Sequence, residues 1–180
     1  MKDLKQLLAN YGNLDNEQKF VSVSDDIWQI GALENIKKEV SDEAFVFHIA
    51  VNMIGNWQSD GWHYIFAEGN ALVPYIGETL SKLGLDELKN AFENVLSVFP
   101  DFAKDCDEDT YYDVINFLSN PGFKVSDERL NAIDMEKRKQ MSNHFNNAIA
   151  DLDDISETLW GYNSEGGDWK IIADYIAKIE

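Results

Sequence analysis

Apolar residues along this chain recur mostly at intervals of three and four positions, the spacing of one face of an α-helix. Ser24 predicts the start of one helix, and an apolar stripe over residues 27–36 continues it. Ser41 predicts a second start, and residues 45–54 are apolar almost all round, which is typical of a central buried helix. Alternation typical of a β-strand is weak, with residues 20–23 as the one short candidate. The pattern therefore predicts an all-α fold.

Residues that end helices divide the rest of the chain into further segments. Gly84, Pro100 and the sequence Asn120-Pro121-Gly122 each predict the end of a helix. Further helices are predicted at about 70–84, 86–99, 110–118, 126–149, 152–160 and 168–179. The chain contains no Ser/Gly/Pro-rich linker and no internal repeat. We therefore expect residues 1–180 to form a single compact domain of about eight or nine helices.

Residues 57–66 concentrate aromatic side chains around the sequence Ser59-Asp60-Gly61, which predicts a turn between two helices. The interpretation that we favour is a helix–helix corner whose rings fill the core. The alternative is that the same rings form the edge of an aromatic pocket.

The charge of the chain restricts its partners. It has 33 Asp and Glu against 15 Lys and Arg, a net charge of −18. Such a charge repels nucleic acid and anionic membrane surfaces, so we expect neither as a direct partner and expect a charged partner to be basic. With Cys106 as the single cysteine, no internal disulfide can form. No apolar run is long enough for a secretory signal or a membrane span, and we expect a cytoplasmic location.

The acidic residues are spread through predicted helical segments, and two groups have few basic neighbours in the sequence. Such runs are commonly just solvated faces, and several of these acids are candidate helix caps. If the fold gathers them onto one face, they are the best candidates for partner contacts. The candidate partner-binding residues are Asp101, Asp105, Asp107, Glu108, Asp109, Asp113, Asp151, Asp153, Asp154 and Glu157.

No motif in the chain carries recognisable catalytic chemistry. Asp105, Asp107 and Asp109 open like a calcium-binding EF-hand loop, but Thr110 stands where Gly is needed and Asn116 where Glu is needed. Weak calcium binding by clustered carboxylates is left as an alternative. The histidines lack metal-ligand spacing, and no nucleophile or phosphate-binding motif occurs. We therefore expect no enzyme, no catalytic residue, no metal site and no cofactor.

A resemblance to a known family rests mainly on residues 45–100. The matching features are the turn Ser59-Asp60-Gly61-Trp62, the pair Ile65-Phe66, the helix end Leu80-Ser81-Lys82-Leu83-Gly84 and the terminator Leu96-Ser97-Val98-Phe99-Pro100. In these features the chain resembles a bacterial family of acidic, all-helical proteins that includes a double-stranded-DNA mimic. The resemblance implies a helical monomer or homodimer with an acidic face that occupies the DNA site of a DNA-binding protein. The matching motifs contain none of the candidate acids, so no functional residue is carried over.

Two hypotheses of function follow. In the first, the chain is a DNA mimic or charge-complementary inhibitor whose carboxylates occupy the DNA-binding surface of a basic protein, such as a transcription factor. In the second, it is an immunity-type or regulatory protein that blocks a toxin or enzyme through the aromatic corner at 57–66. Binding should depend steeply on salt in the first case and tolerate salt in the second.

Overall fold

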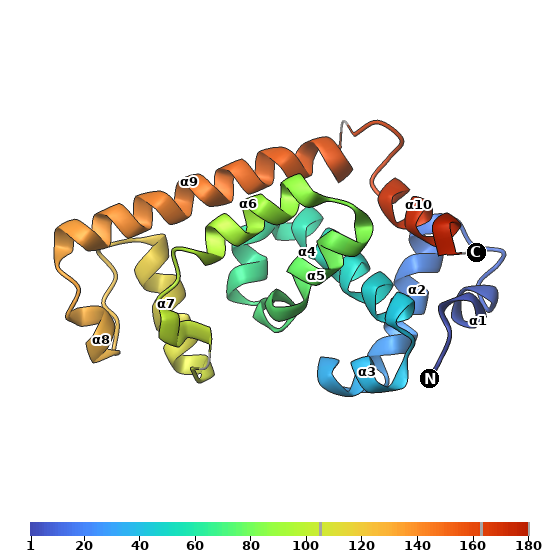
Figure 1. Ribbon diagram of the computed structural model, residues 1–180, viewed down its shortest axis with the longest axis horizontal. Coiled ribbons are helices and arrows are strands. Elements are labelled where there is room, and N and C mark those ends of the chain that lie inside the picture. The colour runs from blue at the N-terminus through green and yellow to red at the C-terminus, as the bar shows by residue number, and fades with distance from the viewer. Residues whose placement is uncertain (105, 163, 180) are drawn as a thin grey trace.

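The computed structural model describes residues 1–104, 106–162 and 164–179, and over these residues it is an assembly of helices without a strand (Figure 1). Within these ranges the chain forms ten α-helices, eight of them with seven residues or more. They are α1 (Leu4–Ala9), α2 (Asn16–Trp28), α3 (Leu33–Glu39), α4 (Asp42–Ala67), α5 (Val73–Leu83), α6 (Asp86–Leu96), α7 (Glu108–Ser119), α8 (Glu128–Asn131), α9 (Met135–Trp160) and α10 (Lys170–Ile179), with short 3-10 segments η1 (Asn70–Leu72) and η2 (Asp101–Lys104). The all-α prediction is confirmed.

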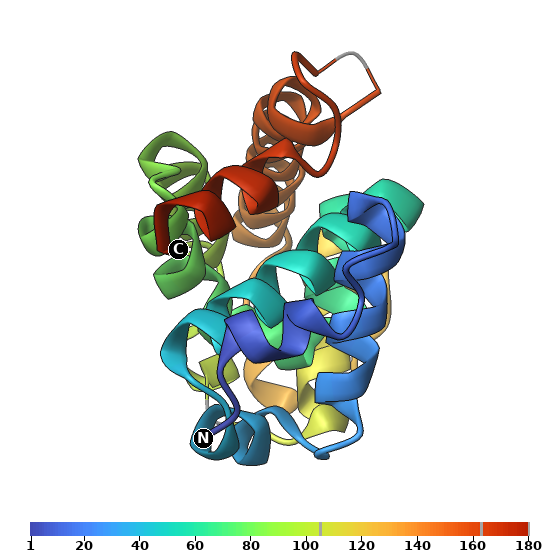
Figure 2. The same ribbon diagram turned by 90° about the vertical axis from the view of Figure 1, so that its right-hand side faces the viewer.

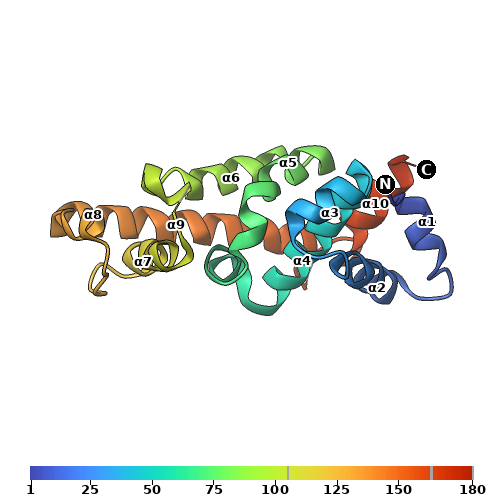
Figure 3. The ribbon, with the colours of Figure 1, turned by 90° about the horizontal axis from the view of Figure 1, so that it is seen from below.

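Two helices of 26 residues, α4 and α9, organise the others. At 1.5 Å per residue α9 is about 39 Å long, and it runs along one edge of the molecule (Figure 1). The N-terminal helices, α10 and both chain termini gather at one end, whereas α7 and α8 lie at the other (Figures 1 and 3). Seen from the first of these ends, α1 to α4 lie on one side and α9 and α10 on the other (Figure 2).

The first half of α4 is the centre of the core, as its sequence predicts. Every residue from Ala44 to Val51 is buried, and so are Met53 and Ile54. Further along the core, aromatic rings from three helices meet: Phe66 of α4 stacks on Phe92 of α6 with ring centroids 5.4 Å apart, and Phe145 of α9 packs edge-on against Phe66. The core is therefore built around α4 and closed by α6 and α9.

Near the N-terminus the predicted helix boundaries are wrong. Ser24 does not begin a helix but lies buried inside α2, whose N-terminus is capped by the Asp15 carboxylate accepting from the Gln18 amide. Residues 20–23, the strand candidate, also belong to α2. The Ser24 side chain is occupied by a long-range contact with His48, which no local pattern reveals.

In the second half of the chain, the helix predicted at 126–149 is divided in two, and its second part is continuous with the helix predicted at 152–160. The segment 126–149 breaks after Asn131, and Asp134 caps a new helix by accepting from the Lys137 amide. That helix, α9, continues past residues 150–151 to Trp160, so the separate helix predicted at 152–160 does not exist. The residues around 150 contain no helix breaker, and helical geometry continues through them.

The predicted aromatic corner is present as a bend within α4. At Gly61 the backbone has φ 73° and ψ −178°, a conformation essentially restricted to glycine. The bend turns the second part of α4 so that Trp62, Ile65 and Phe66 are fully buried. The corner thus fills the core, which agrees with the packing interpretation of residues 57–66.

We predict that Gly61→Ala lowers the free energy of unfolding by about 1–3 kcal/mol, because alanine rarely adopts this backbone conformation. Gly55→Ala is the matched control on the same helix. Gly55 is helical and a Cβ there meets no atom within 4 Å, so the change should be neutral or stabilising by about 0.5–1 kcal/mol. Urea denaturation of both variants tests this, and equal effects would contradict it.

His48 is fully buried in the first half of α4. Its Nδ1 lies 2.9 Å from the Ser24 hydroxyl, and Asn52 donates a hydrogen bond to that hydroxyl. The hydroxyl is therefore free to donate its own proton to His48 Nδ1. The Nε2 atom is buried and has no hydrogen-bond partner in the described part of the chain, and desolvation lowers the pKa of His48 from 6.5 to about 4.

The buried imidazole should make stability depend on pH. Between pH 6.5 and pH 4 the unfolded chain binds a proton at His48 that the folded chain does not, so stability falls as the pH falls through this window. At about 1.4 kcal/mol per unit, the contribution is on the order of 3 kcal/mol. Comparing wild type with His48→Gln by denaturation at several pH values isolates it from the carboxylates. A wild-type curve parallel to that of the variant would refute the prediction.

Candidate functional site

Three acids in the C-terminal half of α9 form one exposed surface. With about 100° between successive residues, Asp151, Asp154 and Glu157 lie within an arc of about 120°. All three are exposed, while Leu152 and Ser156 on the opposite side of the helix are fully buried. We call Asp151, Asp154 and Glu157 the α9 acidic surface.

The α9 acidic surface is not neutralised by its surroundings. The ion pairs in the described part of the chain involve other acids, and none of these three carboxylates lies within 4 Å of a Lys or Arg nitrogen. The last turn of α9 also contains no basic residue. Like charges three or four positions apart destabilise a helix, and Glu157, in the last turn of α9, also faces the negative end of the helix dipole. These acids therefore do not serve the stability of α9.

Asp153 has a different role from its neighbours. It is half-buried, and its Oδ1 accepts from Trp57 Nε1 at 2.8 Å and from the Trp62 amide at 3.4 Å. Both donors belong to α4 on either side of the bend at Gly61. The Asp153 carboxylate thus connects α9 to the bend of α4, and its oxygen is committed to a structural contact.

The N-terminus of α6 lies beside the C-terminal half of α9. His144 of α9 contacts Asn94 of α6 at 3.3 Å, and the two helices run side by side in opposite directions (Figures 1 and 3). Because the helices are antiparallel, the residues at the start of α6, near position 86, lie beside the residues of α9 near position 152. This places the exposed Asp86 and Glu87 toward the α9 acidic surface. From the sequence, Asp86 marks only the start of a helix. Its position near α9 depends on the pairing of α6 with α9, which the sequence does not reveal.

The first predicted acidic group lies around α7, and we call its described members, Asp101, Asp107, Glu108, Asp109 and Asp113, the α7 acidic cluster. Most of these have local structural roles. Asp107 caps α7, and its hydrogen bond from the Thr110 amide lowers the pKa of its carboxyl. Glu108 and Asp109 occupy the first turn, where the helix dipole favours acids. Asp113 accepts from the amides of residues 126 and 127, and Asp101 is exposed in η2. Asp105 lies outside the described residues.

The structure does not gather the two predicted groups onto one face. Ser119, at the C-terminal end of α7, contacts Asn146 in the middle of α9. The N-terminal end of α7 points away from that contact, and the C-terminal half of α9 extends toward the opposite end of the molecule (Figures 1 and 3). The two predicted groups therefore form separate surfaces, and for the described members of the α9 group other than Asp153 no ion pair or helix-capping role is found.

Other chemistry has little support in the described part of the chain. No three His, Cys, Asp or Glu side chains among the described residues are placed to hold a metal ion. Burial raises the pKa of the Cys106 thiol, which reduces its nucleophilicity at neutral pH. None of the described helices combines the length and apolarity needed to cross a lipid bilayer.

Comparison of the chain with models of known protein families, with curated proteins and with solved structures gives no match in any of the three. The resemblance to the acidic helical family therefore stays a prediction.

We predict that Asp153 and Asp154, although adjacent, respond in opposite ways to replacement by alanine. Asp153→Ala leaves the buried donors of Trp57 and Trp62 unpaired and should lower the free energy of unfolding by about 1–3 kcal/mol. Asp154→Ala removes an unpaired exposed charge and should be neutral or slightly stabilising. Chemical denaturation of the two variants distinguishes them, and similar losses in both would show that Asp153 has no special structural role.

Proposed function

We propose that this chain is a charge-complementary binding protein that uses the α9 acidic surface to occupy the DNA-binding surface of a basic protein, as a DNA mimic does. The observation that supports the proposal is the presence of Asp151, Asp154 and Glu157, exposed and without an ion pair to a described residue, as like charges at three-residue spacing on one face of α9. Local features that lower stability are expected mainly at functional sites.

The spacing of these charges supports the comparison with DNA. Residues three positions apart on a helix rise about 4.5 Å, so the three acids place one charge about every 4.5 Å along the axis of α9. One strand of duplex DNA has one phosphate about every 3.4 Å. Over its short length, the α9 acidic surface therefore approaches the linear charge density of a single strand. Asp86 and Glu87 on the neighbouring helix α6 widen it.

The net charge of −18 contributes to the proposal at longer range. A charge of this size steers basic partners toward the protein and repels nucleic acid. Phosphate-like contacts should then make association fast at low salt, and binding should weaken as the salt concentration rises.

The immunity-type alternative requires exposed aromatic anchors. Trp62 and Phe66 of the corner are fully buried, which leaves this alternative without two of its aromatic anchors.

We predict that the triple variant Asp151→Asn, Asp154→Asn, Glu157→Gln weakens binding to the basic partner about tenfold or more at low salt. The partner is first captured from the source cell at low salt and eluted by a salt step. Stopped-flow measurements should then show that the loss appears largely in the association rate. The free energy of unfolding of the free variant should stay the same or increase, because repulsion within α9 is removed.

The matched control is Glu17→Gln, Asp25→Asn, Glu34→Gln, which changes the net charge equally on exposed positions of α2 and α3. It should reduce binding much less. Reversal of Asp107 and Asp109 to lysine tests the α7 acidic cluster in the same assay, and an unchanged rate there assigns binding to α9. The proposal fails if the complex is independent of salt, if duplex DNA does not compete for the captured protein, or if the control weakens binding as much as the α9 variant.

A further inference from the structure

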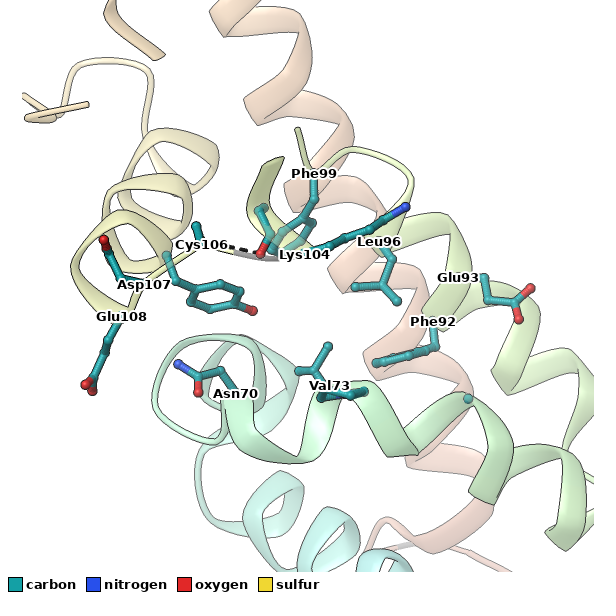
Figure 4. A pocket seen from close by; sticks show the side chains of 14 residues that line it. Asn70, Val73, Phe92, Glu93, Leu96, Phe99, Lys104, Cys106, Asp107 and Glu108 are labelled. Carbon is teal, nitrogen blue, oxygen red and sulfur yellow. Dashed lines mark hydrogen bonds between the residues drawn. The ribbon is translucent and has the colours of Figure 1, made fainter. Parts of the chain in front are cut away.

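A half-open pocket of about 730 Å³ lies between α5, α6 and the start of α7 (Figure 4). Its wall is mainly apolar, with Val73 of α5 opposite Phe92 and Leu96 of α6 and with Phe99 at one side. Pockets that bind small organic molecules typically have about 300–1,000 Å³ and a mostly apolar lining with a few polar groups. The volume and the lining both fit that class.

Tyr111 supplies an unsatisfied polar group to this wall. The residue lines the pocket, its ring packs against Phe99 with centroids 6.1 Å apart, and its hydroxyl oxygen is buried without a hydrogen-bond partner among the described residues. Burial raises the pKa of Tyr111 far above its usual value, so the hydroxyl keeps its proton. An unpaired buried hydroxyl lowers stability, and buried polar groups in folded proteins nearly always have a partner. A hydrogen-bond acceptor on a ligand would provide the missing one.

The rim of the pocket selects for positive charge. Glu93, Asp107 and Glu108 are among the lining residues, with Lys104 as the base among them. Arg129 lies near Asp107 and helps to lower the pKa of its carboxyl, so the negative charge that remains for a ligand is mainly that of Glu108. Glu93 has a partner in Lys89 at 3.6 Å, whereas neither Asp107 nor Glu108 forms an ion pair with a described residue. The rim and the net charge of −18 together attract a cation and repel a carboxylate.

We propose that this pocket binds a small amphipathic amine. Its aromatic or aliphatic body packs between Val73, Phe92 and Leu96, an oxygen or nitrogen acceptor on that body pairs with the Tyr111 hydroxyl, and its protonated amino group lies at the rim near Asp107 and Glu108. This inference is independent of the proposed function, because it uses neither the α9 acidic surface nor a protein partner.

The test begins with three probes that share a 6-methoxynaphthalen-2-yl group, whose ether oxygen is the acceptor. At the 2-position the probes carry an aminoethyl, a hydroxyethyl or a carboxymethyl group, and the binding of each is measured by isothermal titration calorimetry. We expect the amine to bind roughly tenfold more tightly than the acetate, with the alcohol between them. If none of the three binds, or if the acetate binds best, the proposal is wrong.

Gly77→Leu tests the location by filling the pocket. Gly77 lines the pocket within helix α5, and a Cβ there meets no atom within 4 Å. The substitution should therefore reduce binding of the amine at least tenfold. Gly55→Leu is the matched control, since Gly55 is also helical with open space around it but lies on α4, away from the pocket. If Gly77→Leu and Gly55→Leu bind the amine equally well, the binding site is elsewhere.

Tyr111→Phe gives a second and independent test. Removal of the unpaired hydroxyl should leave the free protein equally or more stable, yet weaken binding of the amine about fivefold to tenfold. If the hydroxyl had only a structural role, its removal would instead lower the stability of the free protein and leave the affinity for the amine unchanged. Tyr112→Phe on the same helix is the control, because its hydroxyl donates to Glu68 outside the pocket.

The single cysteine reports directly on occupancy. Cys106 lines the pocket, so bound amine should slow its modification by N-ethylmaleimide several-fold, and the protection should disappear in Gly77→Leu. A modification rate that is unaffected by saturating amine would contradict binding at this site.

Discussion

The first half of α4 is apolar on every side, so no side of it can face water. The other helices are arranged so that they enclose it. Residues 44–51 are buried around the whole helix, so other elements have to enclose them. A helix that is apolar all round is stable only inside a core. Because α2, α5 and α9 each turn their apolar face toward α4, their polar and acidic faces are turned outward. The acidic exterior is thus a consequence of how the core is closed.

The bend of α4 at Gly61 connects this core to the acidic surface. The Asp153 carboxylate accepts hydrogen bonds from both sides of the bend, which fixes α9 against α4. With Asp153 turned toward α4, helical geometry turns Asp154 and its neighbours at three-residue spacing toward solvent. One carboxylate therefore stabilises the fold, and its orientation determines where the exposed carboxylates lie. This is why four acids that look equivalent in the sequence have different roles.

The sequence predicts the main architecture of the molecule but not the electrostatic setting of its acids. The buried helix at 45–54 and the corner at Gly61 follow from local pattern, because full apolarity and a glycine in a turn each have few structural solutions. Ser24 misleads because its buried contact with His48 joins residues 24 positions apart.

The wrong helix boundary predicted at 152–160 matters more for the function. A helix that begins at 152 would place Asp153 and Asp154 where its dipole favours acids, whereas in the continuous α9 they lie inside the helix, without that stabilisation. The pocket needs α5, α6 and α7 side by side, which no single segment encodes.

The α9 acidic surface and the pocket differ in shape but share one energetic property. Each contains groups that lower the stability of the free protein: repelling carboxylates on α9 and an unpaired hydroxyl at Tyr111. Ordinary substitutions would relieve either one without loss of packing, so packing does not account for them. Each is relieved equally well by a ligand that supplies the missing counter-charge or acceptor. The net charge of −18 favours cationic ligands at both sites, because the field of the protein as a whole is negative. Geometry separates the two: a convex helix surface suits the basic face of a macromolecule, and a concave apolar cavity suits a small amine.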